Sequence, residues 1–216
     1  MKYIFHVLGL CFLVGGCAAT SPSLPEAERL TLSDLAEVPA GEYVLTPQNT
    51  SLKFSVTPLG VGRVTGEFTD FEAILNFTGR AGEAVSLKAV AQTSSITVPT
   101  DFIQNMVVGE NWLDVDTYPA ALFSGATQEW SMGPQGQPKS QLAGTLTLKE
   151  ITNPAQFDIE LTCDGIELCP ERQIGFSGKM TLSRQSYGMT TMRSLVSDEI
   201  EMSIAGLLDL TSRVKT

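Results

Sequence analysis

Apolar and polar residues alternate along most of the chain from residue 42 onwards. The clearest case is the stretch EIEMSIAGLLDL at residues 199–210, where every second residue is apolar or glycine. Side chains of a β-strand point to opposite faces at every second residue. The stretch is therefore predicted to form a long strand whose apolar face carries Ile200, Met202, Ile204, Gly206, Leu208 and Leu210.

Similar rows recur to give about eight to ten antiparallel strands, without a strand–helix–strand rhythm between them. The apolar row shifts by one residue at Thr69 and Asp70, which predicts a bulge or bend that curves the sheet. Asn153 and Pro154 have the chemistry of a turn and are predicted to separate two strands. The chain is thus predicted to be all-β. The remaining rows include Phe54, Gly66, Leu75, Leu87, Leu146, Ile159 and Phe176, and residues 119–130 form a further candidate strand.

One segment, PTDFIQNMVVGENWLDVDTYP at residues 99–119, departs from this alternation. Its apolar residues have helical spacing at Phe102, Ile103, Met106 and Val107. Asp101 and Gln104 resemble a capping pair at the start of a helix, and Gly109 suits its end. A single short helix in a β protein commonly lies across an open end of a barrel or sandwich. The helix is predicted to be either a lid or plug, or a plain connection.

The first residues have a different character from the rest of the chain. Lys2 precedes the apolar run IFHVLGLCFLV, which suits a signal peptide and is too short to span a bilayer. The sequence Val14-Gly15-Gly16-Cys17 resembles a bacterial lipobox, in which the signal is removed before a cysteine that then carries lipid. Residues 1–16 are predicted to be a lipoprotein signal peptide, with lipid attached at Cys17. Ordinary cleavage near Ala18 or Ala19, which would release a soluble protein, is the alternative.

Residues 17–41 are rich in Ser, Pro, Thr and acidic residues and show little periodicity. They are predicted to be a lipidated N-terminus and flexible tether with a reach of roughly 25 to 30 Å, preceding a barrel domain at residues 42–216. The alanine after Cys17 is typical of lipoproteins sorted to the outer membrane. We expect a protein of the bacterial cell envelope that faces the periplasm on a lipid anchor, in the outer membrane rather than the inner.

Charge and residue content argue against several functions. The formal net charge of −10, without a block of like charges, argues against a nucleic-acid partner. His6, the one histidine, lies in the signal segment, and no Gly-x-Ser-x-Gly elbow or phosphate-binding glycine loop occurs. We therefore predict no catalytic residue, no enzymatic activity and no cofactor.

Two cysteines remain once Cys11 and Cys17 are accounted for. Cys163 and Cys169 are predicted to form a structural disulfide at a hairpin tip, because paired cysteines are usual in an oxidising compartment. Zinc prefers Cys and His ligands, so no metal site is predicted.

Arg184 directly follows an apolar row. If it points inward, it is either half of an interior ion pair or a contact for a ligand head group, because a buried charge needs a partner. A surface arginine at a strand bend is the alternative.

Six segments in the same order resemble the YceI-like family: EYVLTPQNTSLKFSV, VTGEFTDFEAILNF, WLDVDTYPAALFSG, LAGTLTLKEITNPAQFDIEL, GFSGKMTLSRQSYGM and DEIEMSIAGLL. They extend from Glu42 to about Leu210. The resemblance implies an extended, lipocalin-like antiparallel β-barrel of about eight strands with one short helical insertion, which holds a long isoprenoid chain in an apolar channel. Histidines found in many members are replaced here by Thr50 and Thr57-Pro58, so their role does not carry over.

A barrel of eight strands is about the size whose interior is either filled by side chains or holds one small ligand. Small residues on the inward rows are predicted to leave room between the larger ones: Gly66, Ala73, Ala89, Ala91, Gly144, Gly178 and Gly206. The larger residues are then predicted to line a ligand: Phe54, Phe77, Leu87, Phe157, Phe176, Met180, Met202 and Ile204.

We therefore expect the barrel interior to bind an isoprenoid-type lipid, an isoprenoid or isoprenoid quinone, in a membrane-tethered periplasmic carrier or sequestering protein. The dispersed basic residues favour a neutral head group over a diphosphate. The alternative is a cell-envelope interaction or stress-response lipoprotein whose barrel is filled by its own side chains.

Overall fold

The structure is a computed structural model that describes residues 40–58, 62–78, 84–162 and 173–209. The predicted signal peptide, the lipid-attachment site Cys17, most of the tether and the predicted Cys163–Cys169 disulfide lie outside these residues. Those features stay predictions.

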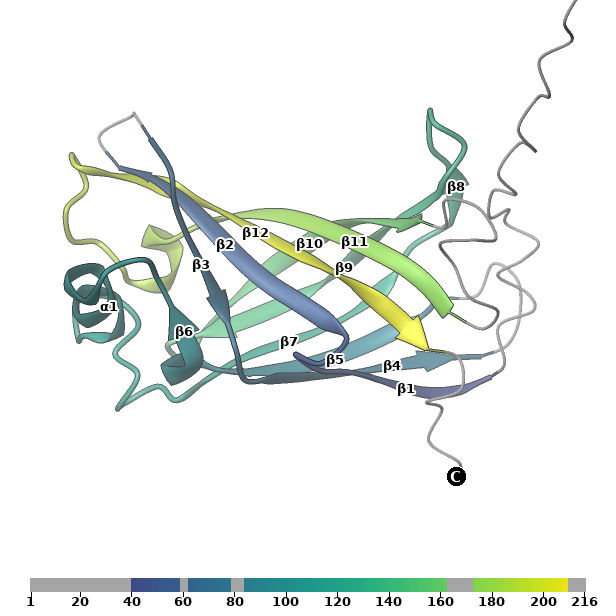
Figure 1. Cartoon of the computed structure of the whole chain (residues 1–216), viewed down its shortest axis with the longest axis horizontal. Coiled ribbons are helices and arrows are strands. Elements are labelled where there is room, and N and C mark those ends of the chain that lie inside the picture. The colour runs from purple at the N-terminus through teal and green to yellow at the C-terminus, as the bar shows by residue number, and fades with distance from the viewer. Residues whose placement is uncertain (1–39, 59–61, 79–83, 163–172, 210–216) are drawn as a thin grey trace, which may run out of the picture.

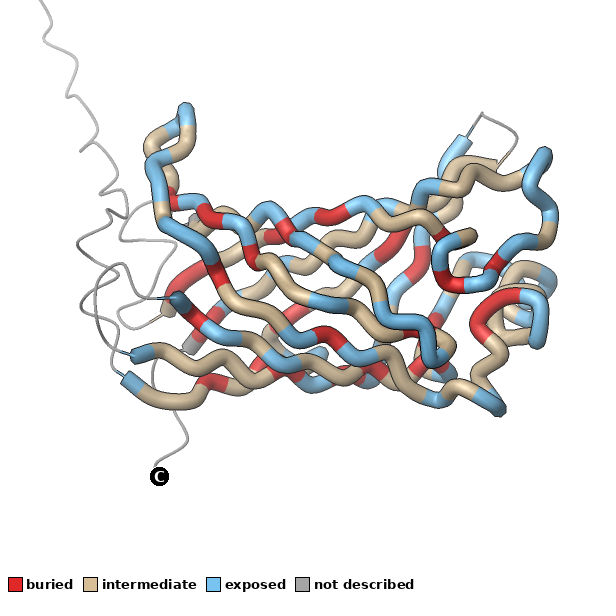
Figure 2. The backbone as a smooth tube through the Cα atoms, turned by 180° about the vertical axis from the view of Figure 1, so that it is seen from behind, coloured by how far each residue is buried: buried red, intermediate tan, exposed pale blue. Residues whose placement is uncertain are grey.

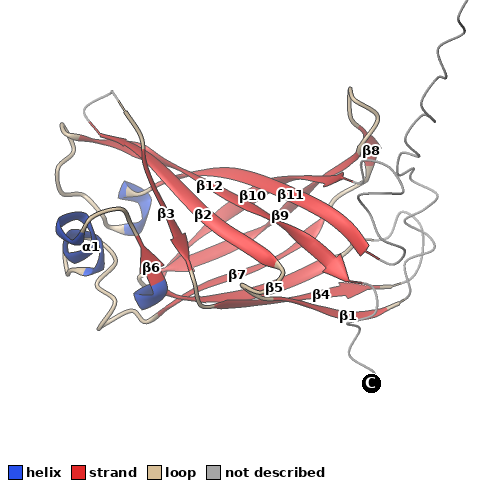
Figure 3. Ribbon diagram, in the orientation of Figure 1, coloured by secondary structure: helices blue, strands red, loops and turns tan. Residues whose placement is uncertain are grey.

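Within the described residues the chain is mostly β-strand, with one α-helix and two short 3-10 helices (Figure 3). The strands in chain order are β1 (Gly41–Leu45), β2 (Thr50–Pro58), β3 (Val64–Phe68), β4 (Phe71–Phe77), β5 (Ser86–Gln92), β6 (Ile96–Thr97), β7 (Ala120–Thr127), β8 (Ser131–Met132), β9 (Pro138–Leu148), β10 (Ile151–Thr162), β11 (Gln173–Ser183) and β12 (Val196–Asp209). The helices are α1 (Asp101–Val108), η2 (Thr93–Ser95) and η3 (Gln185–Tyr187).

These strands make a closed antiparallel barrel of eight continuous strands. β1 and β2 follow one another around a short turn, and both pair with the bent strand made of β4 and β3. β5 and β6 form the next strand, followed by β7, β9, β10, β11 and β12. β12 then pairs with β2, which closes the sheet (Figure 1). The predicted lipocalin-like barrel of about eight strands with one helical insertion is confirmed.

The bend at Thr69 and Asp70 is also confirmed, because it separates β3 from β4. On either side of it the inward row changes phase. Phe68 faces the interior before the bend, and Phe71 and Ala73 face it afterwards. The bend lets one continuous strand serve two sections of the curved wall.

The turn predicted at Asn153 and Pro154 is wrong, because both residues lie inside β10. The chain reverses earlier, at Lys149 and Glu150, whose φ angles of 51° and 61° suit a two-residue hairpin of type I′. Pro154 is tolerated in the strand because β11 pairs with β10 only from Asp158 onwards, so its missing N–H interrupts no ladder with β11.

The predicted helix exists, but its cap differs from the prediction. Thr100 is the N-cap residue, and its hydroxyl accepts a hydrogen bond from the backbone N–H of Ile103. Gln104 instead bonds the backbone of the preceding strand, donating to the carbonyl of Ile96 at 2.8 Å and accepting from the N–H of Val98. These two bonds fix α1 to β6 at one end of the barrel.

Burial alternates along the strands with the period of two that the sequence shows (Figure 2). The barrel has two ends, which we call the α1 end and the opposite end. α1, η3 and the hairpin of β9 and β10 lie at the α1 end (Figure 1). The first residues of β1 and of β11 lie at the opposite end. Among the described residues, no helix combines the length and the hydropathy required to cross a membrane.

Candidate functional site

An apolar cavity of about 230 Å³ lies inside the barrel. Its lining comes from strands all around the wall and extends from Leu113 at the α1 end to Trp130 at the opposite end. A single buried water requires only about 10 to 15 Å³ of such space and polar partners. The lining holds no charged side chain, and Thr127 supplies its one hydroxyl. The cavity therefore suits an apolar guest larger than a few carbon atoms.

All eight residues predicted to line a ligand contribute to the wall of this cavity: Phe54, Phe77, Leu87, Phe157, Phe176, Met180, Met202 and Ile204. Their contact with a ligand stays a prediction. Four members of the apolar row in β12 line the cavity as well: Ile200, Met202, Ile204 and Leu208. The cavity does not support the alternative in which side chains fill the barrel from end to end.

The small residues on the inward rows act in two different ways. Ala73, Ala89 and Ala91 line the cavity and leave it wide, as predicted. The glycines instead let neighbouring groups lie against the wall. A Cβ on Gly66 would lie 2.5 Å from ring atoms of Phe54, and one on Gly178 would lie 2.5 Å from Cδ1 of Ile159.

Gly144 and Gly206 allow the backbone of a neighbouring segment to approach closely, and they do not create empty space in the interior. A Cβ on Gly144 would collide with the carbonyl oxygen of Ser124, and one on Gly206 would collide with that of Asn49. The prediction that these glycines leave room in the interior is therefore wrong, because the space above each of them is already taken.

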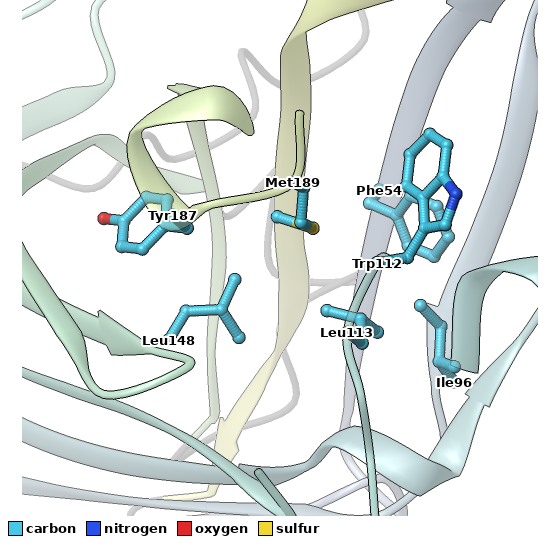
Figure 4. Close-up of a cluster of buried hydrophobic side chains, with 7 residues drawn as sticks. All are labelled: Phe54, Ile96, Trp112, Leu113, Leu148, Tyr187 and Met189. Atoms are coloured by element: carbon cyan, nitrogen blue, oxygen red, sulfur yellow. The ribbon is translucent and has the colours of Figure 1, made fainter. Parts of the chain in front are cut away.

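The α1 end of the cavity is closed by a cluster of buried side chains (Figure 4). Trp112 and Leu113, from the segment after α1, lie among Met189, Leu148 and Phe54. We call residues 107–115 and 184–196 the end plug. The helix itself has no fully buried residue and reaches the cavity only through Val107. The lid or plug alternative thus holds for the segment that follows the helix.

Arg184 anchors the end plug from behind the cavity. Its side chain has no exposed surface, and its guanidinium donates to the carbonyls of Ser197 (2.9 Å), Thr191 (2.9 Å), Val196 (3.0 Å) and Met189. Burial lowers the pKa of Arg184, although the charge of Asp198 acts in the opposite direction.

The alternative of a surface arginine at position 184 is wrong. The side chain is buried but does not line the cavity, because its donors are directed to backbone carbonyls of the loop that follows it and of the first two residues of β12. A contact between Arg184 and a ligand head group stays untested, and this geometry does not favour it.

Two further contacts join the parts of the end plug. Lys149, in the turn between β9 and β10, donates to the carbonyls of Trp112 at 2.7 Å and Glu110 at 3.2 Å. The hydroxyl of Thr191 donates to the carbonyl of Asn111 at 3.2 Å. The plug is therefore bonded across its two segments and to the barrel wall.

The opposite end contains the few polar groups of the lining. The hydroxyl of Thr127 already accepts a hydrogen bond from the N–H of Val85 at 2.8 Å. Trp130 lies between β7 and the short hairpin of β8 and β9, and it is half-buried. In the part of the chain that the structure describes, its indole N–H has no hydrogen-bond partner.

Sequence reasoning missed the residues of the end plug and Trp130. Trp112, Leu113 and Met189 lie in irregular segments with no period of two, and Trp130 lies just beyond β7. The one usable signal is the presence of large apolar residues outside the strands. No group of three or more His, Cys, Asp or Glu side chains converges among the described residues.

A closed eight-stranded antiparallel barrel with an apolar interior cavity is the architecture of the lipocalin-like class. Within that class, the chain belongs to the YceI-like domain family, whose profile matches residues 43–206. A UPF0312 protein of Shewanella oneidensis is 24% identical over 169 residues, covering 77% of this chain and 86% of its own. A UPF0312 protein of Pseudomonas fluorescens is 22% identical over 172 residues, covering 78% and 87%.

Solved structures share the fold at low sequence identity. BcnA of Burkholderia cenocepacia superposes with a TM-score of 0.59 at 19% identity, covering 74% of this chain and 95% of its own. A polyisoprenoid binding domain from Saccharophagus degradans, implicated in plant cell wall breakdown, gives a TM-score of 0.58 at 13% identity, covering 79% and 99%. These similarities support the fold alone.

Proposed function

We propose that this protein binds the apolar chain of an isoprenoid or isoprenoid quinone inside the barrel. It would act in the bacterial cell envelope, facing the periplasm on a lipid anchor at Cys17, as a carrier or sequestering protein. The observation that carries the proposal is the apolar cavity that extends along the barrel from Leu113 to Trp130. The polyisoprenoid binding domain from Saccharophagus degradans, which shares the fold, supports the same class of ligand.

The chemistry of the lining favours a chain without charge. A charged group that entered this cavity would lose its water and find no charged partner in the lining, which costs several kcal/mol. A neutral head such as a quinone loses less. We assign no catalytic role to the cavity, because its lining supplies no carboxylate, imidazole or amine to transfer a proton.

Energetics favour a role in transfer over permanent storage. Each buried methylene contributes roughly 0.8 kcal/mol relative to water. A few isoprene units therefore offset an association cost of about 4 to 15 kcal/mol. The real competitor is a bilayer, in which the chain is equally dry, so the net preference for the barrel is small. A small preference permits both uptake and release at a membrane, which suits a tethered carrier.

The proposal is tested by recovering the ligand. The full chain is purified from bacterial cells and extracted with organic solvent, and the extract is analysed by mass spectrometry. About one isoprenoid lipid per chain is expected. Ala89→Phe, which places a ring in the cavity, should carry far less, whereas Ala205→Phe on the exposed face of β12 should carry as much as the native chain.

Delipidated protein provides the second half of the test. It should take up decylubiquinone, and the Ala89→Phe variant should not. If the native chain yields no stoichiometric amphiphile and the delipidated chain takes up none, the proposed function is wrong.

A further inference from the structure

The α1 end of the cavity is formed by side chains of the end plug. Trp112, Leu113 and Met189 line the cavity, although they come from irregular segments and not from the strands of the wall. They retain only 8%, 6% and 2% of their surface. Figure 4 shows them gathered with Leu148 and Phe54 in one buried cluster. The apolar space therefore ends on these three side chains.

The backbone that carries two of these side chains is held by hydrogen bonds. The N–H of Trp112 donates to the carbonyl of Gly109 at 2.9 Å, and the N–H of Leu113 donates to the carbonyl of Val107 at 3.0 Å. The ammonium of Lys149 donates to the carbonyl of Trp112 at 2.7 Å. Because Lys149 lies in the turn between β9 and β10, this segment is joined to the barrel wall.

The third side chain is held through Arg184. The N–H of Met189 donates to the backbone carbonyl of Arg184 at 3.2 Å, and the carbonyl of Met189 accepts from the guanidinium. The hydroxyl of Thr191, two residues further on, donates to the carbonyl of Asn111 and joins the two segments of the plug. The three side chains can leave the end of the cavity only if several of these hydrogen bonds break.

We propose that the end plug sets the length of the chain that the barrel holds, and that Trp112, Leu113 and Met189 determine this limit. The inference rests on the proposed function and adds a specificity to it: the barrel selects among neutral isoprenoid lipids by chain length. A chain that fits the cavity is dry along its whole length, whereas a longer chain leaves methylenes outside or must displace the plug. The limit holds for either orientation of the lipid, because it depends on the available space alone.

The penalty for excess length is steep. Each methylene that stays in water lowers the equilibrium constant for transfer from a bilayer or micelle about fourfold. Displacing the plug is no remedy, because each hydrogen bond that breaks lowers the same constant about two- to tenfold. The extra methylenes gain nothing in return, since they are equally dry in the bilayer. Uptake should therefore be even up to the limit and then fall sharply.

Competition between homologues measures the limit. The delipidated full chain is incubated with micelles of a nonionic detergent that hold equal amounts of ubiquinones with isoprenoid tails of increasing length. The protein is captured on an affinity resin, and the bound quinones are identified by mass spectrometry. The native chain should recover the homologues evenly up to one length and about tenfold less, or lower still, of the next.

Two substitutions should move the limit in opposite directions. Trp112→Ala removes more heavy atoms than an isoprene unit contains, and the structure around a vacated site relaxes only in part, so the limit should rise by about one unit. Leu113→Phe fills space at the same end and should lower recovery of the longest native homologue about tenfold. Both variants should bind decylubiquinone, whose tail is short, as the native chain does, which shows that they are folded.

A matched pair separates vacated space from a loosened loop. Met189 and Met192 belong to the same segment of the end plug, but Met189 is 2% exposed and lines the cavity, whereas Met192 is 42% exposed and does not. Met189→Ala should raise recovery of the first homologue beyond the native limit by about tenfold. Met192→Ala, the same change three residues away, should keep the native profile.

The outcomes that contradict the inference differ from those that contradict the proposed function. A native profile without a limit, or a limit that is the same in Trp112→Ala, Leu113→Phe and Met189→Ala, would overturn the inference while bound quinone upholds the proposed function. Equal changes in Met189→Ala and Met192→Ala would overturn it too, because loop mobility would then set the length. Recovery of no quinone of any length by the native chain, decylubiquinone included, would overturn both.

Discussion

The guanidinium of Arg184 lies 5.0 Å from the centre of the Trp112 ring, so a buried cation and an aromatic ring join the two segments of the end plug. The same guanidinium donates to four backbone carbonyls, those of Met189 and Thr191 in the loop before β12 and those of Val196 and Ser197 at the start of β12. One side chain therefore holds both the loop and the tryptophan that closes the cavity. A cation over an aromatic ring in such a desolvated place contributes about 2 kcal/mol.

Replacing this arginine should loosen the end plug. Arg184→Met leaves buried carbonyls without donors and removes the cation above Trp112, and we expect a loss of about 3 kcal/mol in the free energy of unfolding. Urea denaturation measures the loss. Hydrogen exchange should become faster in residues 184–196 and 109–115, with much smaller changes in the strands of the wall.

Arg193→Met is the matched control, because Arg193 is exposed and makes one hydrogen bond to the carbonyl of Thr190. It should change stability by no more than about 0.5 kcal/mol. Similar losses in the two variants would contradict the role assigned to Arg184.

The cavity predicts an unusual response to a larger side chain. In a filled core, an added ring costs typically about 1 to 3 kcal/mol. Ala89→Phe places its ring in the empty space beside Phe123 and Ala73, so the delipidated variant should melt at the native temperature or above. Thermal unfolding of delipidated protein checks this, with Ala205→Phe as the control.

Added lipid should separate the same two variants. Decylubiquinone should raise the melting temperature of Ala205→Phe, since a ligand that binds only the native state stabilises it. Ala89→Phe should not respond. A strong destabilisation of delipidated Ala89→Phe would mean that the interior is packed rather than hollow.

The strands were predictable because the signal for them is local. Alternation along β11 and β12 places Phe176 and Met202 on the inward face without knowledge of the neighbouring strands, and both residues line the cavity in the structure. The change of phase at Thr69 and Asp70 was readable for the same reason. The turn at Pro154 was predicted wrongly because a proline is acceptable in a strand that lacks a paired neighbour on one side. Only the complete sheet shows that β11 does not pair with β10 at Pro154.

The closed end was not predictable because it depends on contacts between distant segments. Trp112 and Met189 carry no periodicity that assigns them to the cavity. The burial of Arg184 follows from carbonyls that only the folded loop and the start of β12 present to it. Gly66 was misread because the space over a glycine can be taken by a neighbour such as the Phe54 ring.

Acid should weaken the fold partly through Asp198, which stands beside the end plug. Burial alone would raise the pKa of Asp198. Hydrogen bonds from the backbone N–H of Gln185 and the hydroxyl of Ser183, together with the charge of Arg184, outweigh burial and lower it. A carboxylate whose pKa is lower in the folded state adds stability above its unfolded pKa of about 3.9 and loses it as the pH falls through the folded value.

We therefore expect Asp198→Asn to be less stable than the native chain at pH 7 and to lose less stability between about pH 4 and pH 2. Urea denaturation across this range is the measurement. Glu72→Gln, on the exposed face of β4, is the control. Parallel curves for Asp198→Asn and the native chain would show that this carboxylate adds no stability to the fold.

The membrane anchor is the last expectation to test. If Cys17 carries lipid, the full chain should incorporate labelled palmitate and sediment with membranes, because each buried acyl methylene contributes about 0.8 kcal/mol. Cys17→Ser should lose the label and leave the membrane fraction, whereas Cys163→Ser should keep both. The delipidated cavity of the Cys17→Ser variant should still take up decylubiquinone, because the anchor and the barrel are separate parts of the chain. Membrane sedimentation of Cys17→Ser without label would mean that another feature of the protein holds it at the membrane.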